Sequence, residues 1–283
     1  MRIAYCLLIH KNPEQVSRLI ERIYSPSDYF FIHMDKRVPY DEQWEDALRK
    51  YRKENVFFAP LRYKTPRGPL GLVEATLGGM NQFRSLDYDY FVHLTGQCYP
   101  IKPVNVMKEE LGSKEVAYVE YFKLPSSHWE KENGGLDRIS YYHIYLGEIF
   151  RMLWIRIPRL KRTLPYNLDP YGGSHFFCLP KRFVNFVLEY VSSHPEIVRF
   201  FRHSRIPCEM FFQTILMNSS LRSDVVNDNR WFIRWTEGPL GHPTVLTKED
   251  FSEIMRSDKL FARKFDMSVD KDILDLIDRA IHG

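Results

Sequence analysis

Two adjacent cations near the C-terminus stand between aromatic residues. In the segment 260–266, Arg263 and Lys264 follow Phe261 and precede Phe265. Rings packed on both sides would hold the cations in place, and fixed cations stabilise the negative charge of a diphosphate. The alternative is a surface Arg-Lys pair whose phenylalanines simply fill the core. The segment indicates a phosphate-binding site if it lies at a ligand-binding edge.

A glutamate that could act as a base begins a predicted helix. Glu209 precedes an apolar helical pattern over 210–215, so its carboxylate should lie where the first turn meets a loop. Such a carboxylate can face a cleft, although complementing the helix dipole is the commoner role of a glutamate at this position. We do not expect the adjacent Cys208 to be a nucleophile, because no histidine partner is identified for it.

Paired aspartates that could bind a divalent ion occur twice. Asp87 and Asp89 precede a predicted strand, at the edge of a parallel sheet opposite to where ligands bind. Asp270 and Asp272 stand where the last helix should begin and suit its N-terminus. The four cysteines are widely separated and include no Cys-x-x-Cys pair. We therefore expect no metal site and no cofactor.

Short apolar segments alternate with helical patterns along the chain. This order predicts an α/β fold with a mainly parallel central sheet flanked by helices, in which ligands lie at the carboxyl ends of the strands. Residues 121–175 are punctuated by Gly and Pro and are predicted to be rich in loops. The predicted strands are 3–9, 29–34, 56–59, 90–94, 116–120 and 176–179, and the predicted helices are 13–24, 41–53, 72–86, 181–192, 209–218, 248–256 and 270–281.

Polar residues follow the first two predicted strands. His10 comes after the first strand, and His33 and Asp35 stand at the end of the second. These positions suit contacts to a nucleobase and a ribose, although a lone histidine at a strand end more often has a structural role. The chain contains no Gly-x-Gly-x-x-Gly or Walker-type glycine loop, which disfavours a dinucleotide oxidoreductase or a P-loop phosphotransferase.

The composition narrows the classes of partner. The 283 residues carry 40 Lys and Arg against 36 Asp and Glu, a net charge of +4 that is too small for a nucleic-acid binder. With 44% hydrophobic residues and no low-complexity linker, we expect one globular domain over 1–283. The first apolar segment, 3–9, is too short for a signal or membrane anchor, which favours a cytoplasmic protein.

Three segments, 94–102, 206–214 and 260–266, together resemble the core-2/I-branching β-1,6-N-acetylglucosaminyltransferase family, which includes peptide O-xylosyltransferases. The resemblance extends from about Ile3 to Asp266.

The resemblance implies a GT-A-like fold, with a nucleotide-sugar-binding half at 1–120 and an acceptor-binding and catalytic half at 121–283. It also implies an inverting, metal-independent glycosyltransferase that uses a UDP-sugar and forms a β-linkage to a glycan or lipid-linked glycan. N-acetylglucosamine is the first candidate for the sugar and xylose the second. Family members in animals carry a membrane anchor, and the sequence predicts none in this chain. It is therefore expected to be a bacterial-type member.

The resemblance also assigns roles to residues. Glu209 is expected to be the general base, which can contribute about 10²–10⁴ in rate because a sugar hydroxyl is a very weak acid. Lys264, with Arg263, is expected to bind the diphosphate, and Ile32, His33 and Asp35, with His10, the nucleoside. Cleft residues are expected at Gly96, Gln97, Gly173 and Ser174, with Arg230, Arg234 and Trp235 as further candidates, the two arginines for a second phosphate contact.

Two other functions stay open from the sequence. A metal-dependent nucleotidyltransferase would share the α/β plan but needs a well-placed acidic pair. A non-catalytic glycan- or membrane-binding protein is conceivable, because Cys98 and His175 depart from the family pattern. The segment 151–162 interleaves cations with aliphatic residues and a tryptophan, which is typical of contact with an anionic membrane, although burial of its apolar residues explains the pattern as well. The protein could therefore lie peripherally at the inner face of a membrane.

Overall fold

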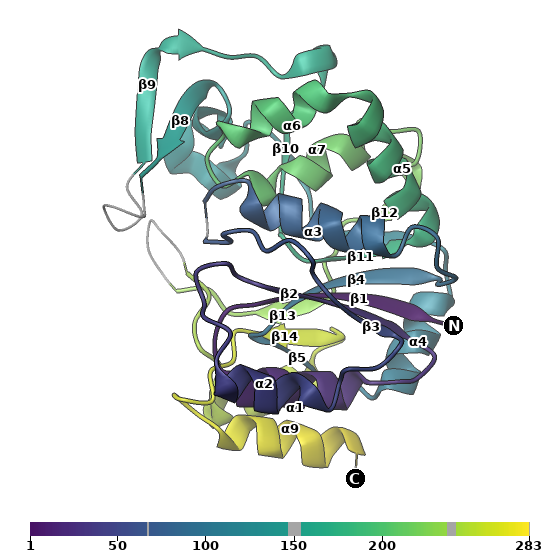
Figure 1. Cartoon of the computed structure of the whole chain (residues 1–283). Coiled ribbons are helices and arrows are strands. Elements are labelled where there is room, and N and C mark those ends of the chain that lie inside the picture. Colours follow the sequence, from purple (N-terminus) through teal and green to yellow (C-terminus); the bar gives the residue numbers. More distant parts are fainter. Residues whose placement is uncertain (67, 147–153, 237–241, 283) are drawn as a thin grey trace. The chain divides into compact units, whose positions relative to one another are not determined.

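The computed structural model describes residues 1–66, 68–146, 154–236 and 242–282. Its chain forms two compact units, and Figure 1 labels most of their helices and strands. Each unit is assembled from segments that are separate in the sequence, so the units interleave along the chain. The predicted functional halves, 1–120 and 121–283, stay a prediction. Unit 1 comprises Met1–Pro60, Ser85–Glu115 and Arg230–Gly283, and unit 2 comprises Leu61–Arg84 and Val116–Asn229.

A parallel sheet forms the core of unit 1. All residues of β1 (Ile3–Ile9) are buried, as expected for a strand covered on both faces. In the register, Ile9 pairs with Met34 and Leu8 pairs with Thr95, so the carboxyl ends of neighbouring strands lie at one edge. The strand order is β4-β1-β2-β3, with β2 at Tyr29–Met34, β3 at Val56–Phe58 and β4 at Tyr90–Thr95.

Amphipathic helices cover this sheet. Helix α1 buries Val16, Leu19 and Ile20, and α2 begins where the Asp41 carboxylate accepts a hydrogen bond from the Trp44 amide at 3.2 Å. The two helices lie side by side in Figure 1. The α-helices of unit 1 are α1 (Pro13–Ile23), α2 (Glu42–Arg49), α4 (Val104–Gly112), α8 (Phe251–Arg256) and α9 (Asp272–His282), with a 3₁₀ turn, η6 (Lys248–Asp250), before α8.

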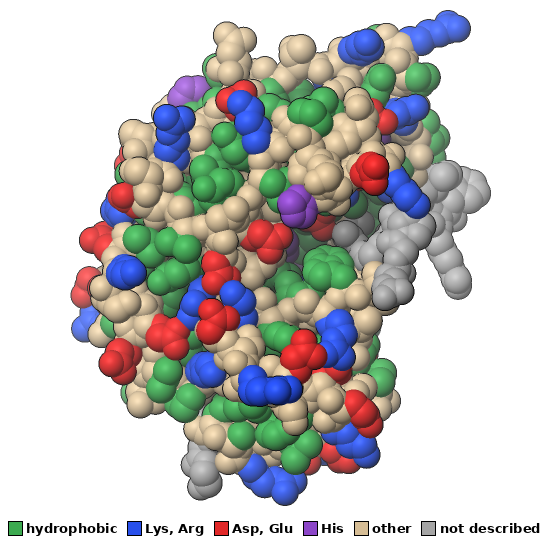
Figure 2. All heavy atoms as spheres, turned by 180° about the vertical axis from the view of Figure 1, so that it is seen from behind, with side chains coloured by type: hydrophobic (Ala, Val, Ile, Leu, Met, Phe, Trp, Pro, Cys, Tyr) green, Lys and Arg blue, Asp and Glu red, His purple; other side chains and the backbone are tan. Residues whose placement is uncertain are grey.

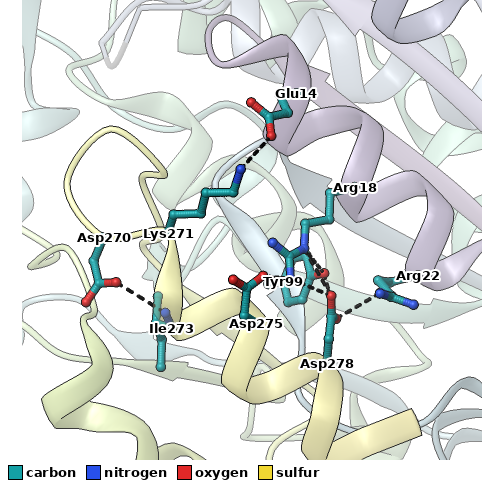
Figure 3. A network of polar contacts seen from close by, with 9 residues as sticks. All are labelled: Glu14, Arg18, Arg22, Tyr99, Asp270, Lys271, Ile273, Asp275 and Asp278. Carbon is teal, nitrogen blue, oxygen red and sulfur yellow. Dashed lines mark hydrogen bonds and ion pairs between the residues drawn. The ribbon is translucent and has the colours of Figure 1, made fainter.

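A buried carboxylate attaches the C-terminal helix to the rest of unit 1. Asp278 of α9 accepts hydrogen bonds from Arg18 at 2.7 Å and from the Tyr99 hydroxyl at 2.8 Å, and it pairs with Arg22 at 2.9 Å (Figure 3). Asp270 accepts a bond from the Ile273 amide at 3.2 Å in the first turn of the same helix, which confirms the capping role predicted for this residue.

A second, smaller sheet brings the C-terminal segment beside the end of β4. Its order is β13-β14-β5, with β13 at Trp231–Ile233, β14 at Phe261–Arg263 and β5 at Cys98–Pro100. Arg263 pairs with Cys98 in the antiparallel register, and Trp231 stacks on Phe261 with ring centroids 4.9 Å apart. Phe261 and Phe265 are buried, as expected, and Arg263 is the last residue of β14, so Lys264 directly follows an anchored strand.

Unit 2 combines short strands with helices. Strands β12, β6 and β11 form a mixed sheet, in which β6 runs parallel to β12 and antiparallel to β11. Their bounds are Val225–Val226, Ala117–Val119 and Phe177–Pro180. Two further pairs are β7 (Phe122–Lys123) with β10 (Tyr171–Gly172), and β8 (Tyr141–Tyr145) with β9 (Trp154–Lys161). The α-helices are α3 (Gly71–Gln82), α5 (Lys181–Ser193), α6 (Pro195–Arg202) and α7 (Phe211–Met217). The 3₁₀ turns are η1 (Ser127–Glu132), η2 (Leu136–Arg138), η3 (Pro165–Asn167), η4 (Pro207–Glu209) and η5 (Arg222–Asp224).

The structure confirms a mixed α/β fold with a mostly parallel central sheet flanked by helices. Two local predictions are wrong. Glu209 ends the 3₁₀ turn η4 instead of beginning a helix, because Met210 leaves helical geometry before α7 starts. Residues 121–175 contain the β8–β9 hairpin, whose strands the Gly and Pro content had obscured.

In the described ranges, no helix has both the length and the apolar character needed to cross a membrane. The face shown in Figure 2 intersperses Lys and Arg with Asp and Glu. This distribution agrees with the near balance of 40 basic and 36 acidic residues.

Candidate active site

In unit 1, the loops that follow β1, β2 and β4 meet at the carboxyl edge of the parallel sheet. The Asp35 amide donates to the Ile9 carbonyl at 2.9 Å, and the Gly96 amide donates to the Leu8 carbonyl at 3.1 Å. A Cβ atom on Gly96 would lie 2.8 Å from Val16 of α1, so glycine allows the close packing of this loop. These contacts bring three of the predicted donor or cleft positions, His10, Asp35 and Gly96, to one edge.

The carboxylate of Asp35 is fully buried and is held by its own loop. It accepts bonds from the Arg37 amide at 2.8 Å and from the Arg37 guanidinium at 2.6 Å. The pair fixes the loop after β2. Ile32 and His33, predicted as nucleoside contacts, are 2% and 0% exposed within β2, whereas His10 is exposed. A ligand can therefore reach His10 directly, while the side chains of Ile32 and His33 lie inside the protein.

Lys264 is a half-buried cation at the same edge. The described residues offer it no ion pair, although its carbonyl accepts a bond from the Leu246 amide at 2.8 Å. Desolvation by the surrounding protein, together with Lys11 and Arg263, holds the pKa of Lys264 below its usual value, against the opposing charge of Asp266. A cation that burial and like charges destabilise gains most from an anionic ligand.

His10 lies in the field of the same cations. Desolvation and the charge of Lys11, with contributions from Arg37 and Lys264, hold the pKa of His10 below its usual value, and Asp35 opposes them. The lowered pKa favours the neutral imidazole, and the neighbouring cations favour a bound anion.

The segment that carries Lys264 is attached to α1 by side chains that the sequence analysis missed. Asp266 pairs with Lys11 and accepts a bond from the Asn12 amide group at 2.7 Å. Gln15, one turn into α1, donates to the Gly96 carbonyl at 2.8 Å and accepts from the Met267 amide at 2.9 Å. Asp266 closes the motif Ala-Arg-Lys-Phe-Asp and could have been found from it, whereas Gln15 has no local signal.

Gln97 joins the loop after β4 to the same segment. The Phe265 amide donates to the Gln97 carbonyl at 3.0 Å, and the Gln97 side chain donates back to the Phe265 carbonyl at 3.3 Å. Gln97 is buried, so its main role is to position the segment that carries Lys264. It was predicted to line the cleft. The next residue, Cys98, lies with its sulfur 3.4 Å from the Thr95 hydroxyl.

Arg230 and Arg234 are already neutralised by carboxylates of unit 1. Arg230 pairs with Glu110, and Arg234 pairs with Asp250 and Glu253. Trp235 is half exposed and forms an isolated bridge with Pro243. The structure therefore does not present the two arginines as unpaired cations comparable to Lys264.

In unit 2, Glu209 forms an ion pair with Arg138 at 2.7 Å. The side chains are 16% and 8% exposed, so the pair is largely shielded from water. Arg138 also pairs with Glu132, which in turn pairs with Arg205. The guanidinium lies 3.6 Å from the centroid of the Trp129 ring. This network holds the Glu209 carboxylate in one orientation.

The predicted cleft residues Gly173 and Ser174 lie beside Glu209. The Gly173 amide donates to the Glu209 carbonyl at 2.9 Å, and a Cβ atom on Gly173 would lie 1.9 Å from the Glu120 carbonyl oxygen. Only glycine fits there. The Ser174 carbonyl accepts a bond from Gln213 of α7. Unit 2 thus brings Gly173 and Ser174 beside the backbone of Glu209.

The network behind Glu209 was not predicted from the sequence: Arg138, which pairs with Glu209, and the residues that hold it, Trp129, Glu132 and Arg205. A weak signal was present, because Gly134 and Gly135 have φ of 64° and 90° and allow the chain to reverse between Glu132 and Arg138. The spacing of the charged residues gave no indication of the network.

Among the described side chains, no group of three His, Cys, Asp or Glu residues gathers in a way that could hold a metal ion. Asp87 and Asp89 lie at the amino end of β1, where they bond to the Arg2 side chain at 2.7 Å and to its amide at 2.6 Å. This location agrees with the prediction that the pair stands away from the ligand-binding edge.

A family model described as Core-2/I-Branching enzyme matches residues 3–255. The chain is 26% identical over 308 residues to xylosyltransferase 2 of Canis lupus familiaris and 26% identical over 310 residues to xylosyltransferase 1 of Homo sapiens. These alignments cover 100% of this chain but 34% and 31% of the two relatives, so the chain spans about a third of their length.

A solved structure of mannose-1-phosphate geranyltransferase from Thermus thermophilus is similar at a TM-score of 0.31 and 12% identity. The similarity covers 79% of this chain and 67% of that chain.

Proposed function

The chain belongs to the Core-2/I-branching enzyme family, and we propose that it is a glycosyltransferase that moves a sugar from a UDP-sugar to a hydroxyl group of a glycan or glycoconjugate. The observation that carries the proposal is Lys264, a half-buried cation at the carboxyl edge of a parallel sheet, for which the described residues provide no ion pair.

Lys264 would stabilise the departing diphosphate. As the bond between the anomeric carbon and the UDP oxygen breaks, negative charge develops on the leaving group, and a cation already in position stabilises that charge. Arg263, whose charge also acts on Lys264, would extend the positive field. In this proposal the protein's own cations carry the charge stabilisation, and transfer requires no metal ion.

Glu209 would act as general base. The acceptor oxygen attacks the anomeric carbon as its proton passes to the Glu209 carboxylate, and UDP leaves from the opposite side. A single displacement inverts the anomeric centre, so an α-linked donor gives a β-glycoside. The ion pair with Arg138 supports this role because it fixes the carboxylate before the acceptor binds.

We propose UDP-xylose as the first donor to test and UDP-N-acetylglucosamine as the second. The resemblance of the sequence motifs ranked them in the opposite order. The curated relatives named above are xylosyltransferases, and this is the reason for the change.

Thermal unfolding with UDP and UDP-sugars tests the proposal before any acceptor is known. A ligand at about 100 times its Kd stabilises the folded state by roughly 2.7 kcal/mol, which is readily measured. We expect stabilisation by UDP and by one UDP-sugar, with and without EDTA. Stabilisation that EDTA removes would contradict metal independence, and the absence of any response would contradict the function itself.

A further inference from the structure

The β8–β9 hairpin of unit 2 presents an apolar face to solvent. Tyr142, Ile144 and Ile155 share this face, because Ile144 pairs with Ile155 and Tyr142 pairs with Ile157 in the antiparallel register. The three residues are 37%, 42% and 44% exposed. Exposed β-branched and aromatic residues that are neighbours across two strands mark an interaction surface more often than scattered ones do.

The opposite face of the hairpin is attached to the protein. His143 is buried, its imidazole lies 2.7 Å from the Asp137 carbonyl, and its amide donates to the His203 carbonyl at 2.9 Å. The apolar face is therefore held in position from behind.

An open cavity of about 650 Å³ adjoins this face, and Tyr142 contributes to both. Four cations, a histidine and no carboxylate are among its lining residues. Those residues include Lys161, Arg162, Arg199, Arg202 and His203, with Phe200 and Thr163 beside them. Such a cavity suits an anion.

Arg162 is the fixed cation of this cavity. It donates to the carbonyls of His203, at 2.8 Å, and Phe200, and it lies over the rings of Tyr142 and Phe200 at 4.6 and 4.0 Å. These partners are carbonyls and rings, so within the described residues no carboxylate neutralises it. Arg199 and Arg202 are compensated in part by Glu196 and Glu74, whereas no described carboxylate pairs with Lys161.

We propose that the hairpin face and the cationic cavity together form a docking surface for a membrane that contains anionic phospholipids. A lipid phosphate would enter the cavity, while Ile144 and Ile155 would lie at the boundary between headgroups and acyl chains. The exposed apolar face favours a membrane over a soluble anion as the partner of this surface, because a soluble anion would leave these apolar side chains in water. Arg151, Met152 and Leu153 of the segment singled out in the sequence lie outside the described residues, and the proposal does not use them.

Vesicle flotation of the full chain tests this surface independently of any transferase activity. We expect binding to vesicles of equal parts phosphatidylcholine and phosphatidylglycerol, weaker binding at high salt and no binding to pure phosphatidylcholine. Lys161→Gln and Arg199→Gln should each weaken binding roughly five-fold, and Ile144→Ser with Ile155→Ser should abolish it.

Matched controls lie in unit 1. Arg49 of α2 pairs with Asp46 three residues before it, as Arg199 of α6 does with Glu196, so Arg49→Gln should leave binding unchanged. Val269 is an exposed apolar residue, and Val269→Ser should also have no effect. Absence of binding to anionic vesicles would overturn the proposal. Binding to a soluble anionic polysaccharide but not to vesicles would overturn it in favour of an acidic polymer as the occupant.

Discussion

Lys11 and Asp266, which are 255 positions apart in the sequence, form an ion pair at the carboxyl end of β1. The Asp266 side chain is mostly buried and also accepts bonds from Asn12 and from the Ser268 hydroxyl, each at 2.7 Å. The pair attaches the segment that carries Lys264 to the loop that carries His10. Two regions from opposite ends of the chain thereby form one cationic edge.

We expect Asp266→Asn to destabilise the protein by about 1–3 kcal/mol at pH 7, because it removes the charge that Lys11 contacts. Burial opposes ionisation of Asp266, but hydrogen bonds from Lys11, Ser268 and Asn12 outweigh it and hold the pKa of Asp266 well below its ordinary value. A depressed pKa contributes stability above the unfolded-state pKa of about 4, and this stability is lost as the pH falls through the folded-state pKa.

Urea unfolding at pH 7 and at lower pH measures this contribution. The difference between Asp266→Asn and the unchanged protein should shrink steadily below about pH 4. Asp87→Asn is the control, because the Asp87 side chain is exposed and its pair with Arg2 should contribute little. A difference that does not depend on pH would rule out the ion pair as its source.

Lys264→Ala should lower the transfer rate by about 10²–10³ and weaken UDP binding. It should change the free energy of unfolding by no more than about 0.5 kcal/mol, because no ion pair with a described residue is lost. Steady-state kinetics and UDP titration by calorimetry check both parts. Lys271→Ala removes a lysine whose partner, Glu14, lies on the surface, and should leave the kinetics unchanged (Figure 3). Unchanged UDP affinity in Lys264→Ala would contradict the phosphate role.

Glu209→Gln should reduce transfer by at least about 10² while UDP binding stays nearly the same. The amide keeps the shape of the side chain and leaves the backbone bond from Gly173 intact. Single-turnover kinetics with a saturating donor measures the chemical step. Normal turnover would remove Glu209 from the mechanism, and an equal loss of UDP affinity would point to a structural role in its place.

UDP binding should be accompanied by proton uptake near pH 6, through His10. Its pKa is held below the ordinary value in the free protein by desolvation and by neighbouring cations, and a bound diphosphate would raise it. Affinity for UDP should therefore increase as the pH falls from 7 to about 6. Calorimetry in buffers of different ionisation enthalpy measures the uptake, and His10→Gln should abolish most of it. The same uptake in His10→Gln would assign the proton to another group.

Local patterns were sufficient for the two strands whose ends carry His10 and Asp35, but they did not predict β14, which leads into Lys264. The predicted strands 3–9 and 29–34 agree with β1 and β2, because continuous buried residues bounded by polar ones leave little choice of secondary structure. Predictions based on helical periodicity were close for α1 and α5. They failed at Glu209, since Pro207 and the left-handed backbone of Ile206 produce a 3₁₀ turn that periodicity does not indicate.

The sequence by itself determined the α/β class, the strand ends where His10 and Asp35 lie, and the chemical types of Glu209 and Lys264. These properties depend on neighbours within a few residues along the chain. Tertiary structure alone decided that Gln15 joins Gly96 to Met267 and that Arg138 orients Glu209, because such contacts link residues tens to hundreds of positions apart. It also decided which cations carboxylates neutralise, as at Arg230 and Arg234, and which, like Lys264 and Arg162, have no carboxylate partner among the residues that the structure describes.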